Sequence, residues 1–164
     1  MKLVFNLSSA VLSPQILIDC DMFESGCIGG SVFQALYFNG IQTEADYPYT
    51  GEVGRCRFNS SKSVLPYTDT PTVYLTDESN GEAGLQDLVA KKGPVAALVD
   101  ASSDSFKEYK SGVYYNPDCK KKEKDLHHAV LVVGYGTDPK EGDYWLVVSV
   151  IPGFNNSIPS SSFS

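Results

Sequence analysis

The stretch from residue 126 to residue 150, "LHHAVLVVGYGTDPKEGDYWLVVSV", constrains the fold more than any other part of the chain. Residues 128–136 and 143–150 are apolar and rich in β-branched side chains, and the polar segment between them is typical of a β-hairpin turn. The sequence upstream of the hairpin predicts a helix or turn over 12–20 with apolar Ile16, helices over 31–40 and 82–93, a helical turn over 105–112, and strands over 71–76, 94–101 and 113–116. A chain of 164 residues can form one domain or two small lobes, and these elements predict an α+β fold built on a small antiparallel sheet or barrel.

The only two histidines of the chain, His127 and His128, stand at the head of this hairpin. A histidine beside a buried strand is a candidate general acid or base, which then requires a nucleophile within hydrogen-bond reach. Judged without other information, the tandem histidines are better explained as polar residues at the surface or at a strand edge. The motif therefore raises the question of which residue the nucleophile is.

Charge and hydropathy exclude several classes of partner. The net charge of −7 disfavours binding to nucleic acid. No apolar run approaches the roughly 18 residues that span a bilayer, so we expect no membrane partner. The N-terminus resembles a signal peptide, but Asn6, Ser8 and Ser9 interrupt its apolar run, so we expect no convincing signal peptide in this chain.

The four cysteines are Cys20, Cys27, Cys56 and Cys119. Their spacing is not that of a zinc ribbon, and the chain has only two histidines that could serve as further metal ligands. We therefore expect no metal and no cofactor. Disulfides are the better interpretation and indicate an oxidising compartment. Three Asn-X-Ser sequons, which begin at Asn6, Asn59 and Asn155, agree weakly with this.

Six motifs occur in the order and approximate spacing of the papain-family cysteine proteases. They are "LSPQILIDCD", "GCIGG", "IQTEADYPYTG", "GPVAALVDA", "SFKEYKSGVYYNPDC" and "LHHAVLVVGYG". The chain resembles the cathepsin L-like branch over residues 12–147. The resemblance implies an incomplete papain-like two-lobe fold, truncated at both ends. Residues 1–70 would be a helical lobe without its central helix, 71–150 a β-barrel lobe without its last strands, and 151–164 a disordered, non-homologous tail.

The resemblance also assigns catalytic positions. His128 matches the family's general acid/base, and His127 precedes it. The family's nucleophilic cysteine and oxyanion-hole glutamine have no counterpart here, and Ser149 stands in place of the asparagine that orients the histidine. We therefore expect the chain to be catalytically inactive by itself.

The remaining implied roles are structural or concern substrate. Cys20 and Cys56 match a disulfide pair, whereas Cys27 and Cys119 match half-cystines whose partners fall in the unmatched segments, so we expect both as thiols outside any disulfide. The implied substrate-binding residues are Gly29, Gly30, Ser31, Val32, Leu98, Leu126, His127 and Ala129. A glycine bend, a helix start and a barrel core would also account for these residue types.

Three functions remain open at this point. In the first, the chain is an inactive cathepsin L-like fragment, whether a pseudoenzyme, a decayed gene copy or a product of intron retention. In the second, it is a peptidase whose nucleophile comes from elsewhere. In the third, it is a module that binds peptides without cutting them. The implied partners are an extended peptide or protein substrate, a protease propeptide, or an inhibitor. The family implies a lysosomal or secreted location.

Overall fold

The computed structural model describes residues 11–21, 26–30, 40–64, 81–120, 122–149 and 158–161. The chain divides into two compact units, residues 1–74 and 75–164. The predicted helix at 31–40 and the predicted strand at 71–76 fall almost entirely outside the described residues.

The first unit combines short helices with long loops. The helices in its described residues are α1 (Gln15–Cys20) and the single 3-10 turns η1 (Gly26–Ile28) and η2 (Ser60–Lys62). Pro14 directly precedes α1, where its fixed φ suits a first helical turn. The helix buries Ile16 completely, as the pattern "LSPQILIDC" predicts.

A fully buried amide, that of Gln15, holds the loop that follows residue 49. Its Oε1 accepts hydrogen bonds from the backbone N–H groups of Thr50 (3.0 Å) and Gly51 (3.2 Å). Its Nε2 donates to Asp19 and to the backbone oxygen of Glu52, each at 2.8 Å. The side chain thereby uses both lone pairs and both protons, which is what a buried amide requires.

The disulfide Cys20–Cys56, with a Cα–Cα distance of 4.8 Å, ties the end of α1 to the loop before η2. Beside it the buried ring of Tyr47 donates its hydroxyl proton to Asp19 at 2.7 Å, and the guanidinium of Arg57 lies 4.9 Å from the ring centre. Burial raises the pKa of Asp19, but the hydrogen bonds from Tyr47, Gly54 and Gln15 outweigh it and the net pKa is lowered. The carboxylate is therefore held ionised inside this network.

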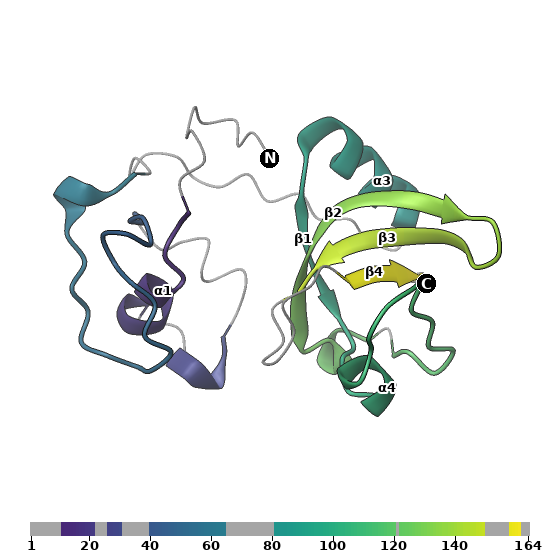
Figure 1. The fold of residues 1–164 in the computed structure, drawn as a ribbon, viewed down its shortest axis with the longest axis horizontal. Coiled ribbons are helices and arrows are strands. Elements are labelled where there is room, and N and C mark those ends of the chain that lie inside the picture. The colour runs from purple at the N-terminus through teal and green to yellow at the C-terminus, as the bar shows by residue number, and fades with distance from the viewer. Residues whose placement is uncertain are drawn as a thin grey trace. The chain divides into compact units, whose positions relative to one another are not determined.

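The second unit is built on an antiparallel sheet in the order β1-β2-β3-β4 (Figure 1). Its strands are β1 (Val95–Val99), β2 (His128–Asp138), β3 (Gly142–Val148) and β4 (Ile158–Ser161). The predicted hairpin is confirmed as β2 and β3. A Cβ at Gly136 would lie 2.7 Å from the Tyr144 hydroxyl on the paired strand, so a larger residue there would have to displace the Tyr144 side chain.

The last strand lies in the tail for which the sequence predicts disorder. Residues 158–161 instead pair with 144–147 of β3. An edge strand presents unpaired N–H and C=O groups that any extended segment can satisfy, with little demand on its side chains. Composition alone does not reveal such pairing. The other residues of the tail lie outside the described part of the chain.

One face of the sheet forms a core with α3 (Gly81–Lys92), and the short helix α4 (Asp104–Lys107), at the other end of the strands in Figure 1, adds Phe106 to it. Leu85 and Val89, one turn apart on α3, bury the helix against the strands, and Gly93 ends it in the left-handed conformation. Residues 113–116, predicted as a strand, contribute a single bridge position at Tyr114. The buried core consists of Leu85, Val89, Val99, Phe106, Val130, Val132, Trp145 and Val147.

We expect loss of the Cys20–Cys56 bond to destabilise the first unit. The two cysteines are 36 residues apart, and closing a loop of that length stabilises the folded state by about 4 kcal/mol in the chain-entropy model. The double variant Cys20→Ser/Cys56→Ser should lower the free energy of unfolding by that amount in denaturant titrations, whereas Cys27→Ser serves as the control. A dominant Cys27–Cys119 link in non-reducing peptide maps would contradict the assignment.

Candidate active site

The pairing of β2 with β3 brings His128 and Ser149 together. Leu131 is paired with Val148, so the next position places Ser149 opposite Val130. His128 lies two residues before Val130 and therefore on the same face of the sheet. Its Nε2 is 2.6 Å from the Ser149 Oγ, and Ser149 is 5% exposed. Two residues 21 positions apart thus form one partly buried polar contact.

An aromatic ring covers the imidazole on the core side. Phe106 of α4 lies edge-on to His128, with ring centres 6.1 Å apart. Ser103 fixes the start of α4 because its Oγ accepts from the Phe106 backbone N–H at 3.1 Å. Tyr114 packs edge-on against the same phenyl ring at 5.5 Å. The helix therefore presents Phe106 as a wall of the histidine site, a role that sequence reasoning missed.

The surroundings lower the pKa of His128. Burial, which disfavours the imidazolium, is the larger cause, and the charge of neighbouring His127 is the second. The ring is consequently neutral near pH 7. If Nε2–H donates to Ser149, then Nδ1 carries the lone pair of a general base. If Ser149 donates instead, Nδ1 carries the single proton of the neutral ring and can only donate a hydrogen bond, because proton transfer to a leaving group requires the imidazolium.

The carboxylate of Asp100 holds the loops at the end of the sheet where His128 lies. It follows β1 and is 7% exposed, and its oxygens accept from the backbone N–H groups of Ser102 (2.9 Å) and Lys120 (3.1 Å). Hydrogen bonds from Ser102, then that from Lys120, lower the pKa of Asp100 to about 2. An aspartate directly after a buried strand is the sequence signal for this role, although sequence reasoning did not use it.

The residues expected to bind substrate fall into both units. In the second unit Leu98 and Ala129 are direct neighbours on β1 and β2, on the face opposite His128. Exposed His127 donates its backbone N–H to the Val99 oxygen at 3.3 Å, and half-buried Leu126 precedes it. Thus the structure brings the second-unit positions to one end of the sheet.

In the first unit Gly29 and Gly30 are exposed, and Gly29 has φ +113° with open space where a Cβ would be. Ser31 and Val32 lie outside the described residues. Among the described residues, no group of three or more His, Cys, Asp or Glu side chains could hold a metal ion. Nor is any described helix long and apolar enough to cross a membrane.

Comparison with known proteins identifies the class. The family model "Papain family cysteine protease" matches residues 2–149, which include His128 and Ser149. The chain therefore belongs to the papain family of cysteine proteases. Within that family it is cathepsin L-like: it is 42% identical over 146 residues to a cathepsin L-like protein of Caenorhabditis elegans and 43% identical over 142 residues to cathepsin L of Sarcophaga peregrina.

Solved structures agree on the fold. The digestive procathepsin L2 proteinase from the larval midgut of Tenebrio molitor superposes on 96% of this chain with a TM-score of 0.83 and 35% identity. The Carica candamarcensis cysteine protease CMS1MS2, solved in complex with E-64, covers 96% of the chain with a TM-score of 0.71 and 30% identity. The predicted papain-like α+β fold is thereby confirmed.

The chain spans only part of these proteins. The alignments with both cathepsin relatives include 83% of this chain but 40% of each relative, and the superposition covers 50% of the procathepsin L2 chain. Family membership and fold follow from the comparisons. The activity of the whole relatives does not automatically extend to a chain of this length.

We expect the imidazole of His128 to titrate below the ordinary histidine value of about 6.5. The variant His127→Asn should raise the pKa of His128, because it removes the neighbouring positive charge, but should leave it below 6.5 because the ring stays half-buried. NMR titration of the ring protons measures both values. A His128 pKa at or above 6.5 in the unchanged chain would contradict the description of the site.

This shift also sets the sign of a pH effect on stability. Between the folded-state pKa and about 6.5 the unfolded chain binds more protons at His128 than the folded chain does. The contribution of His128 to the free energy of unfolding therefore falls as the pH drops through this window, and it changes no further below the folded-state pKa. His128→Gln should remove this part of the pH dependence.

Proposed function

We propose that this chain carries the histidine half of a papain-like thiol-protease site and has no peptidase activity by itself. The observation that carries the proposal is the 2.6 Å contact between His128 Nε2 and the buried Ser149 Oγ, within a chain that belongs to the papain family. Ser149 is thus a positioning residue that orients the imidazole, in place of the family's asparagine.

The reaction of this family explains why a histidine alone is insufficient. A thiol attacks a peptide carbonyl as the thiolate, and a nearby imidazolium stabilises that thiolate. His128 is held in the neutral form by burial, so in our proposal it becomes an imidazolium only when it takes the proton of an adjacent thiol. The same proton would later pass to the leaving amine.

The four cysteines of this chain make contacts other than one with His128. Cys20 and Cys56 form the disulfide. The Cys27 thiol donates to the Gly51 oxygen at 3.6 Å, and the Cys119 thiol donates to the Lys120 oxygen at 3.9 Å. Both contacts use the S–H proton, which a nucleophile must lose. We propose that neither cysteine serves as the nucleophile.

The proposed environment is the lysosome or the secretory pathway, and the proposed ligand is a peptide in an extended conformation. A disulfide within the first unit supports an oxidising compartment. The cathepsin relatives support the same location, and one structural neighbour was solved with the inhibitor E-64. A propeptide or a protease inhibitor would occupy the same surface.

We expect the 164-residue chain to release no fluorophore from a fluorogenic dipeptide substrate above the rate of its His128→Ala variant. Loss of the nucleophile alone lowers turnover by about 10⁶ in a well-studied serine protease. A peptidyl epoxide probe, followed by mass spectrometry, tests the thiols directly and should not label Cys27 or Cys119. Hydrolysis that His128→Ala abolishes would overturn the proposal.

A second candidate function, peptide binding without cleavage, has its own support. Gly29 and Gly30 expose backbone next to η1, and the site of a Cβ at Gly29 is open. Exposed backbone N–H and C=O groups can pair with an extended peptide as an added strand. In this function the chain is a pseudoprotease that captures peptides or propeptides.

Binding of a fluorescein-labelled apolar peptide, followed by fluorescence anisotropy, tests this function. Gly30→Pro removes one backbone donor, so the dissociation constant should rise by about 2- to 10-fold, the equivalent of one hydrogen bond. The matched control Gly30→Ala keeps the N–H group and should bind like the unchanged chain. Equal affinities of all three proteins would exclude strand addition at this position.

A further inference from the structure

A loop of the first unit, remote in sequence from the histidine site, displays the motif Asn59-Ser60-Ser61. The motif fits Asn-X-Ser with a middle residue other than proline, as attachment of an N-linked glycan requires. All three residues are exposed. Asn6 and Asn155, which begin the other two sequons, lie outside the described residues, so Asn59 is the sequon whose geometry the structure describes.

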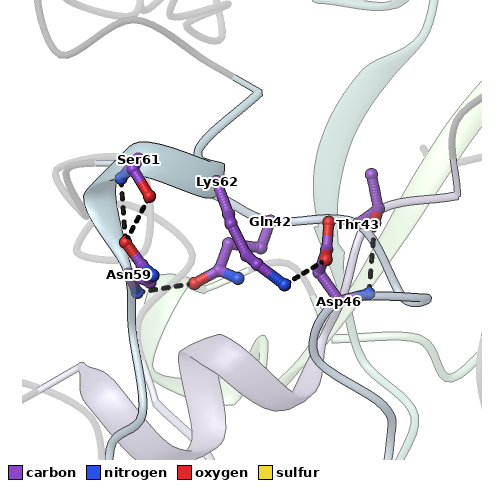
Figure 2. A network of polar contacts seen from close by, with 6 residues as sticks. All are labelled: Gln42, Thr43, Asp46, Asn59, Ser61 and Lys62. Carbon is purple, nitrogen blue, oxygen red and sulfur yellow. Dashed lines mark hydrogen bonds and ion pairs between the residues drawn. The ribbon is translucent and has the colours of Figure 1, made fainter.

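Within the motif the first and third residues contact each other directly (Figure 2). The Asn59 Oδ1 accepts hydrogen bonds from the Ser61 backbone N–H at 3.0 Å and from the Ser61 hydroxyl at 2.8 Å. Both contacts engage the oxygen of the amide, and neither engages its nitrogen, Nδ2. The nitrogen that would carry a glycan is therefore not consumed by the contacts that shape the turn.

The backbone under this motif is anchored while its side chains face solvent. The Asn59 backbone N–H donates to the Oε1 of Gln42 at 2.7 Å, and Gln42 is 2% exposed (Figure 2). On the other side of the turn the Lys62 ammonium pairs with Asp46 at 2.7 Å. A substituent on Asn59 would thus extend from a fixed point of the surface without displacing buried groups.

A further observation concerns the compartment. Asn59 is three residues beyond Cys56, whose disulfide with Cys20 indicates folding under oxidising conditions. N-linked glycans are attached to secreted proteins at surface loops of this kind. The compartment that forms this disulfide is therefore one in which the sequon can meet the transferring enzyme.

We propose that Asn59 is an N-glycosylation site of this protein. The co-substrate is an oligosaccharide carried on a polyprenyl diphosphate. The Nδ2 of Asn59 forms a bond to the anomeric carbon of the first sugar, and the bond from that carbon to the diphosphate oxygen breaks. One proton leaves Nδ2, and the diphosphate departs on its lipid.

The product is compatible with the fold. The amide keeps its oxygen after the reaction, so the two hydrogen bonds from Ser61 can persist in the glycosylated protein. The glycan would cover the exposed turn at residues 59–62, in the unit that does not contain His128. The proposal does not depend on whether the chain cuts or binds peptides.

The test is expression of the full chain behind a heterologous secretory leader in insect cells, with an Asn-Gly-Thr acceptor tag at its C-terminus. Peptide-N-glycosidase treatment in ¹⁸O-water, followed by peptide mapping, identifies each occupied asparagine by its conversion to labelled aspartate. We expect a glycan at Asn59 that is lost in Ser61→Ala. It should be retained in the matched control Ser60→Ala and in Ser61→Thr, which keeps the hydroxyl.

The acceptor tag shows that the molecules reached the transferring enzyme, independently of how well each variant folds. A glycan on the tag together with an unmodified Asn59 in the unchanged chain would overturn the proposal. Occupancy of Asn59 that survives Ser61→Ala would overturn it as well, because the hydroxyl would then have no part in recognition.

Discussion

The register between β2 and β3 is the constraint on which the candidate site depends. Each strand alternates its side chains between two faces, so a shift of one residue would move the whole apolar set of one strand away from the core. Burial of Val130, Val132 and Val147 on one face therefore fixes the register. Once it is fixed, His128 and Ser149 must lie on that same face at one end of the sheet, where they meet at 2.6 Å.

The chemistry of His128 follows from its position at the margin of the core. Burial beside Phe106 disfavours the charged imidazole, and the contact with Ser149 restrains the ring. A general base must be neutral and oriented before a nucleophile approaches. The surroundings of His128 in this chain therefore hold the ring in the neutral, oriented form that a general base needs.

In the described part of the first unit, buried polar groups contribute much of the stabilisation. Gln15, Gln42 and Tyr47 are almost completely buried, and each has hydrogen bonds to loop backbone. These contacts and the disulfide Cys20–Cys56 hold the segment 50–64 in a defined conformation although it is mostly exposed. Because buried side chains hold the backbone of this segment, an exposed residue such as Asn59 lies at a defined position on the surface.

The sequence by itself determined the elements and the family. Apolar alternation and a polar turn are local signals, so the hairpin, the helix at Gly81–Lys92 and the strand at Val95–Val99 could be predicted, and six ordered motifs identified the papain-like fold. The resemblance already placed Ser149 where the family's asparagine orients the histidine, and the structure added the contact of its hydroxyl with Nε2. Only the tertiary structure decided that Phe106 covers the ring, that Asp100 holds two loops, and that residues 158–161 pair as a strand. These contacts join residues distant in the chain. Their formation depends on register, burial and the demand of an open sheet edge for partners, none of which a local pattern encodes.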